Sequence, residues 1–210
     1  MALMKSKDDS FKYHDTKTNN IRTNFILKNV YAFLLKDYYN FDAEMYATNQ
    51  NEKNVLKCIE KNLTIFRDFY KIEMKNFVET INIMDKSYIE SVLLKTANVL
   101  FEDGITWCRI IAYFSFVGEL GIWCISKNLP ISFINDLYES FKHFVDIKLE
   151  KWIQDHDGWE GILTVFESEE LVKEEISKSD WIKRMLQVTI SMLGALAKIG
   201  NTVYNYNNII

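Results

Sequence analysis

Apolar side chains recur every three to four residues along much of the chain, which is the spacing of one face of an α-helix. The pattern predicts helices at residues 21–39, 54–82, 87–100 and 131–152. The second of these is long enough to be two helices, and a polar loop is predicted at 40–53. No segment shows the two-residue alternation of a strand, and no internal repeat is visible. An all-α fold is therefore predicted.

The segment WCRIIAYFSFVGELGIWCI, residues 107–125, is apolar on nearly every side of its predicted helix. Such a helix is buried in a protein core or lies in a membrane. The charged residues Arg109 and Glu119 and the polar flanks favour a core. Thr106 precedes this helix and can cap it through its hydroxyl oxygen. We expect a globule of about eight helices around this central one.

Other local signals predict where helices begin and end. Ser87 and Glu90 have the spacing of a capping box. Pro130 is suited to the start of the helix at 131–152, and Asp157-Gly158 is expected to break that helix. Asp157 is also expected to cap a short helix, whose apolar side is formed by Ile162, Leu163 and Phe166.

Composition narrows the class of protein. The 210 residues include seven Gly and one Pro, where about 15 and about 10 are typical, and turn-rich β folds need more of both. The net charge of −4 and the absence of a basic block argue against nucleic-acid binding. Cys58, Cys108 and Cys124 are odd in number and match no zinc spacing, which suggests a reduced, intracellular protein without a metal or cofactor.

Arg109 does not fit its surroundings, because it lies in the first turn of the most apolar helix. The helix N-terminus carries a partial positive charge, and an unpaired buried cation is costly. A carboxylate partner is therefore expected. It can be the neighbouring Asp103 or Glu102, or an acidic group on a bound partner, and the sequence leaves both open.

Catalysis is not expected. Asp155-His156-Asp157 is the only cluster of potentially catalytic side chains, and it lies where a helix is predicted to end. No matching nucleophile, set of metal ligands or phosphate-binding loop accompanies it.

Two segments carry a family resemblance. VLFEDGITWCRIIAYFSFVGEL, residues 99–120, resembles the first homology motif of the Bcl-2 family of apoptosis regulators, with Asp103, Gly104, Trp107 and Arg109 at matching positions. EKWIQDHDGWEGILTVF, residues 150–166, resembles the second motif. It is matched by Trp152, Ile153, Gln154, Gly158 and Trp159.

A third resemblance is weaker, and the chain departs from the family pattern at three positions. Leu63 followed by Arg67-Asp68 resembles the third motif, but Arg67 replaces its glycine. This departure implies a structural segment that would be a poor BH3 ligand. Thr106 replaces the usual Asn and Cys108 replaces a Gly in the first motif. The thiol at Cys108 is expected to narrow the choice of partner.

The resemblance implies a Bcl-2-like bundle with a hydrophobic surface groove. An amphipathic BH3 helix lies in such a groove and pairs its Asp with the motif arginine, here Arg109. Trp152 and Trp159 are expected to be scaffold. Any single aromatic of the groove could equally be ordinary core. The implied groove residues are Tyr70, Met74, Phe77, Val78, Thr96, Val99, Leu100, Thr106, Trp107, Arg109, Ala112, Phe116 and Phe166.

The function implied is inhibition of apoptosis by sequestering BH3 helices of Bax, Bak or Bim-like proteins. The alternatives are an inhibitor of innate immune signalling with the same fold and, less favoured, an effector that permeabilises membranes. The abundance of Lys, Asn and Ile over Arg suggests an AT-rich genome and hence a viral, poxvirus-like copy. For such a copy, the family resemblance implies a location in the host cytoplasm and at the outer mitochondrial membrane.

Three regions are expected along the chain: a flexible N-terminus at 1–19, the helical domain at 20–178 and a tail at 179–210. The tail has an apolar run from Met185 to Ala197, which is shorter than the about 20 residues of a spanning helix. A weak membrane anchor and a helix packed on the protein both remain open.

Overall fold

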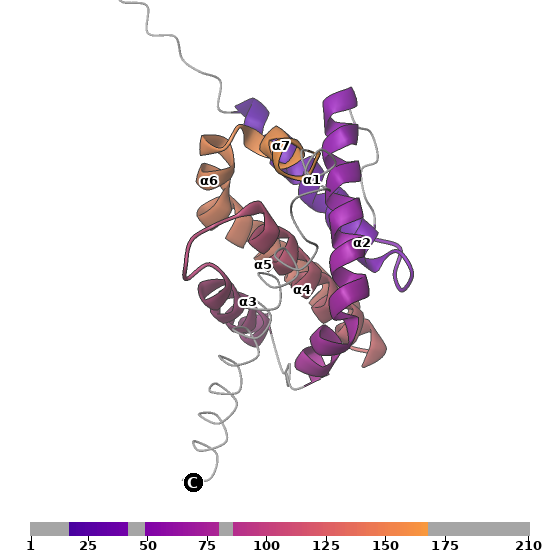
Figure 1. Cartoon of the computed structure of the whole chain (residues 1–210). Helices are drawn as coiled ribbons and strands as arrows, with labels where there is room; N and C mark the ends of the chain where they lie inside the picture. Colours follow the sequence, from indigo (N-terminus) through magenta and orange to yellow (C-terminus); the bar gives the residue numbers. More distant parts are fainter. Residues whose placement is uncertain (1–16, 42–48, 80–85, 168–210) are drawn as a thin grey trace, which may run out of the picture.

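The computed structural model describes residues 17–41, 49–79 and 86–167, and all regular structure in these ranges is helical (Figure 1). The all-α prediction is confirmed. A π-helical segment, Val145–Leu149, joins α5 to α6, and a 3₁₀ turn, Gly158–Glu160, precedes α7. The α-helices are α1 Lys17–Leu35, α2 Gln50–Glu79, α3 Lys86–Leu100, α4 Trp107–Ser126, α5 Ile131–Phe144, α6 Glu150–Asp155 and α7 Gly161–Glu167.

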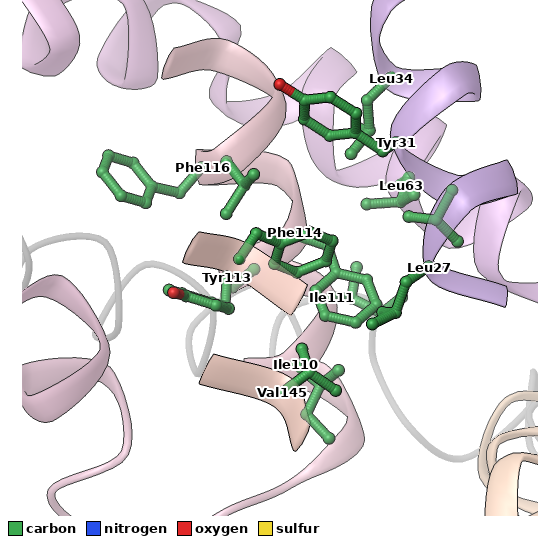
Figure 2. Close-up of a cluster of buried hydrophobic side chains, with 14 of the residues drawn as sticks. Leu27, Tyr31, Leu34, Leu63, Ile110, Ile111, Tyr113, Phe114, Phe116 and Val145 are labelled. Atoms are coloured by element: carbon green, nitrogen blue, oxygen red, sulfur yellow. The ribbon is translucent and has the colours of Figure 1, made fainter. Parts of the chain in front are cut away.

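Helix α4 lies at the centre of the bundle and contacts α1, α2, α3 and α5. Every residue from Ile110 to Gly121 is buried. Among the described helices, α4 alone is long and apolar enough to cross a membrane, but 78% of its most apolar window is buried inside the protein. The prediction of a central core helix is confirmed. Figure 2 shows side chains of α4 packed among those of α1, α2 and the π-helical segment.

Helix α2 differs from its prediction. It is a single helix of 30 residues, where two were considered, and it begins at Gln50 within the segment predicted as a loop. The side-chain oxygen of Asn49 accepts a hydrogen bond from the amide of Glu52 at 2.9 Å. This cap satisfies an amide that would otherwise lack a partner at the helix N-terminus. It explains why a polar segment without an apolar stripe is helical.

The predicted helix at 131–152 is interrupted by the π-helical segment. Four-residue steps in an α-helix drift by about 40° each around the axis, because one turn takes 3.6 residues. A wider π turn removes part of this drift. The buried side chains indeed follow one another at intervals of four, whereas Ile147 between them is 59% exposed. The buried set is Phe141, Val145, Leu149 and Ile153.

The sequence analysis is corrected at three helix ends: the Asp157 turn and both ends of α1. The chain turns at Asp157 as predicted, but the Asp157 side chain makes no hydrogen bond that caps the following helix. Its φ of 64° is left-handed, so the residue forms the turn through its backbone. Helix α1 begins at Lys17, inside the predicted flexible terminus, and ends at Leu35. Tyr38, predicted on its apolar stripe, lies beyond it and is half exposed.

Glycines bring helices unusually close at two places. A Cβ on Gly118 of α4 would stand 2.8 Å from the Cδ2 of Leu34 in α1. A Cβ on Gly161 would overlap the backbone carbonyl oxygen of His156. Both positions therefore exclude a side chain, but the obstacle is a movable side chain in one case and the backbone in the other.

We expect Gly161→Ala to lower the free energy of unfolding by more than about 3 kcal/mol, because the backbone around His156 has to move. Gly118→Ala is the matched comparison, and its cost should be about 1–2 kcal/mol, because Leu34 can change rotamer. Urea unfolding followed by circular dichroism measures both. Equal losses in the two variants would show that the difference between the two obstacles is unimportant.

Candidate functional site

The loop before α4 sets the position of Arg109. The amide of Gly104 donates to the carbonyl of Phe101 at 3.0 Å, and the φ of Gly104 is 108°, which a side chain would disfavour. Thr106 is extended, and its hydroxyl oxygen accepts from the amide of Arg109 at 3.3 Å. The predicted Thr106 cap is confirmed. The turn and the cap together fix the first turn of α4.

The guanidinium of Arg109 turns back over this loop. Its Nη1 donates to the carbonyl of Gly104 at 2.6 Å, and its Nη2 lies 3.2 Å from Oδ2 of Asp103. The Arg109 side chain is 18% exposed and that of Asp103 is 84% exposed. The local carboxylate considered in the sequence analysis is therefore present. Because Asp103 is so exposed, the pair leaves Arg109 close to solvent and within reach of another acidic group.

The tryptophans of the two homology segments pack together beneath the Arg109 turn. The ring centroid of Trp107 lies 5.3 Å from that of Trp152 and 6.0 Å from that of Trp159. Trp159 is buried, and its indole N–H donates to the hydroxyl of Thr23 in α1 at 3.0 Å. That hydroxyl donates in turn to Glu150 at 2.8 Å. These contacts agree with the scaffold role expected for Trp152 and Trp159.

The structure places most of the predicted groove residues in the core. Phe77 of α2 and Phe116 of α4 are brought together, with ring centroids 5.5 Å apart. Val99 is half-buried and Thr106 is exposed. A ligand helix would reach the buried members only after the groups that cover them move away. Those buried members are Tyr70, Met74, Phe77, Val78, Thr96, Leu100, Trp107, Ala112, Phe116 and Phe166. The groove itself stays a prediction.

The sequence analysis did not predict that two hydroxyls would be buried without a hydrogen-bond partner. Within the described part of the chain, the hydroxyls of Thr96 in α3 and Tyr113 in α4 are fully buried without a hydrogen-bond partner. Burial raises the pKa of the Tyr113 phenol above its ordinary value. Unpaired buried hydroxyls cost free energy. Burying these two side chains therefore stabilises the protein less than their apolar surface alone suggests.

Arg67 holds three helices together. Its Nε lies 3.1 Å from Oε1 of Glu119 in α4, and its Nη1 donates to the carbonyl of Leu34 in α1 at 3.4 Å. The side chains of Arg67 and Glu119 are 20% and 9% exposed. This pair explains the acidic residue in the apolar α4, and it is the structural role expected for Arg67.

Comparison with known proteins agrees with the motifs and the helical geometry. Residues 59–159 match the profile of a family described as apoptosis regulator proteins, Bcl-2 family. Rat Bcl-2-like protein 1 is 31% identical over 72 residues, which cover 34% of this chain and 30% of the rat protein. Its chicken counterpart is 28% identical over 106 residues, covering 49% and 46%. These matches support membership of the Bcl-2 family.

Two solved structures have a similar fold. Trichoplax adhaerens trBcl-2L2, in a crystal structure with trBak BH3, has a TM-score of 0.63 at 21% identity. The match covers 70% of this chain and 99% of that one. Chicken BOK has a TM-score of 0.59 at 14% identity, covering 72% and 99%. In sequence, the chain spans less than half the length of the curated Bcl-2 relatives described above.

We expect Arg67→Met to destabilise the protein by about 2–4 kcal/mol, because the carboxylate of Glu119, which is almost fully buried, would lose its ion-pair partner. The double variant Arg67→Met, Glu119→Met should recover most of this loss, since two apolar side chains can replace a buried ion pair. Thermal and urea unfolding test both expectations.

The exposed pair between Lys127 and Glu79 supplies the control for this experiment. Its side chains are 45% and 42% exposed, so Lys127→Met should cost much less than Arg67→Met, because solvent screens the pair. A comparable loss in Arg67→Met and Lys127→Met would contradict the bridging role of Arg67.

Proposed function

We propose that this protein is a pro-survival member of the Bcl-2 family that binds BH3 helices of Bax, Bak or Bim-like proteins and so inhibits apoptosis. The observation that carries the proposal is the placement of Arg109. Its guanidinium lies at the N-terminal end of α4, where it contacts the carbonyl of Gly104 and the exposed carboxylate of Asp103.

An amphipathic helix with one aspartate suits this placement. The planar guanidinium can bind a carboxylate through two parallel hydrogen bonds. Apolar side chains on the same face of the ligand would contact Phe77, Phe116 and their neighbours once these are uncovered. The solved trBcl-2L2 complex, in which a related fold is bound to a BH3 segment, supports this mode of binding.

Two features favour a survival role over membrane permeabilisation. Arg67 ties the segment that resembles a BH3 motif to Glu119 and Leu34, which hinders its release as a ligand. Helix α4, although long and apolar enough to span a membrane, forms the centre of the core. Insertion would require the loss of that core.

We further propose that the protein acts in the cytoplasm of a host cell and at the outer mitochondrial membrane, and that its source is a virus. The second proposal rests on residue usage, because 21 of the 25 basic residues are lysine. The base composition of the coding sequence tests it. The tail at 179–210, the segment considered for membrane anchoring, lies outside the described residues.

Titration calorimetry with a panel of BH3 peptides tests the main proposal. We expect submicromolar binding by at least one peptide of the Bak, Bax or Bim type. Arg109→Ala should weaken that binding about 10- to 150-fold, because a charge-assisted, partly desolvated pair contributes about 1.5–3 kcal/mol. Arg109→Lys should also weaken it, because lysine keeps the charge and loses the planar fork.

Lys151→Ala, which removes an exposed cation from α6, controls for net charge and should leave the affinity unchanged. Absence of binding to every peptide would refute the groove model. Equal weakening by Lys151→Ala and Arg109→Ala would show that Arg109 acts only through the overall charge.

Expression of the full chain in cultured cells should protect them from a BH3 trigger, and Arg109→Glu should abolish the protection, because it repels the ligand carboxylate. Imaging of the same cells should show the protein in the cytoplasm and on mitochondria. Cell death on expression, together with dye release from liposomes by the purified protein, would instead identify an effector.

A further inference from the structure

The ion pair between Arg109 and Asp103 bears directly on how a ligand would bind. Asp103 belongs to the same loop as Gly104, and its side chain is 84% exposed. Its carboxylate pairs with the guanidinium of Arg109, which is the group that binds the ligand carboxylate in the proposed function. The Arg109 site is therefore occupied by an acidic group of the chain itself.

A guanidinium has five N–H donors, but a bidentate carboxylate needs two that point in parallel. Nη1 of Arg109 is held by the backbone carbonyl of Gly104 at 2.6 Å, and Nη2 faces Asp103 at 3.2 Å. The carbonyl belongs to a turn fixed by the bond between Gly104 and Phe101. The Asp103 side chain, by contrast, can rotate into solvent, because in the described part of the chain its carboxylate has no other hydrogen-bond partner.

We propose that Asp103 is a specificity-determining residue that competes with the ligand carboxylate for Arg109. This inference rests on the proposed function, because it concerns the same site. An incoming carboxylate has to displace Asp103 from Nη2 or approach the guanidinium beside a second negative charge. Either way, part of its interaction with Arg109 is offset by the loss of the internal pair.

The competition also changes selectivity. With Asp103 in place, Arg109 has a partner in the free protein and keeps it when the bound helix lacks an acidic residue. A ligand with asparagine in place of aspartate therefore loses less affinity than it would against an unpaired arginine. Asp103 thus lowers the discrimination between acidic and neutral ligand helices and widens the range of helices that bind.

The test uses the full chain and two probes, a Bim-type BH3 peptide and the same peptide with its aspartate changed to asparagine. Asp103→Ala should bind the acidic peptide about two- to fivefold more tightly than the wild type, which corresponds to the loss of an exposed ion pair. Its affinity for the asparagine peptide should not change. Asp103→Asn, which keeps the side-chain shape, should give a smaller gain in the same direction.

Glu102→Ala is the matched control, because Glu102 is the exposed neighbouring acid and the hydrogen bonds of the Arg109 guanidinium go to Gly104 and Asp103 instead. It changes the net charge by the same amount and should leave the ratio of the two affinities as in the wild type. Circular dichroism should show the same helicity for all variants, since Asp103 and Glu102 are both exposed.

Equal tightening of both peptides in Asp103→Ala would overturn the competition, and so would the same gain in Glu102→Ala. Weaker binding of the acidic peptide in Asp103→Ala would also overturn it, because Asp103 would then contact the ligand favourably. If the wild type and Asp103→Ala bind neither peptide, the proposed function fails along with the inference. Binding by the wild type without an effect of Asp103→Ala rejects the inference alone.

Discussion

A helix of 20 residues with apolar side chains on every face needs protein on every face, and the rest of the bundle supplies it around α4. The need for close packing around α4 also accounts for its charged residue and for one of its glycines. Glu119 is compatible with the core because Arg67 reaches it from α2, and Gly118 lets α1 approach closely. At its N-terminal end α4 meets solvent, and there Arg109 lies. The candidate site is thus the place where the central helix leaves the core.

The structure also shows why some features were readable from the sequence. The extent of α4 and the Thr106 cap depend on residues within a few positions of one another, so local patterns predict them. The structural role of Arg67 was inferred from a resemblance, but its partners, Glu119 and the carbonyl of Leu34, lie 52 and 33 residues away. No local pattern specifies such a pairing.

Other features depend on packing between residues far apart in the sequence, so local sequence patterns could not predict them. The π-helical segment keeps Val145 and Leu149 on the buried side, yet the same residues fit an ordinary helical stripe. For the predicted groove, core and ligand surface require the same residue types. Phe77 and Phe116 are buried against each other here, and the pattern that identified them would be identical if they lined an open groove. The partner of Arg109 remained open for the same reason, since a nearby aspartate and a ligand aspartate offer the same chemistry.

The hydrogen bonds of Thr23 have a consequence for the synthesis of the chain. Thr23 is separated by 127 residues from Glu150 and by 136 from Trp159, although all three meet in the folded protein. Ribosomes add about 5–20 residues per second, so Trp159 follows Thr23 by roughly 7–27 s. During that interval the Thr23 hydroxyl lacks both of its partners, whereas α2 and α4, on which α1 also packs, have already been made when it ends. The contact of α1 with Glu150 and Trp159 is therefore among the last that the growing chain can complete.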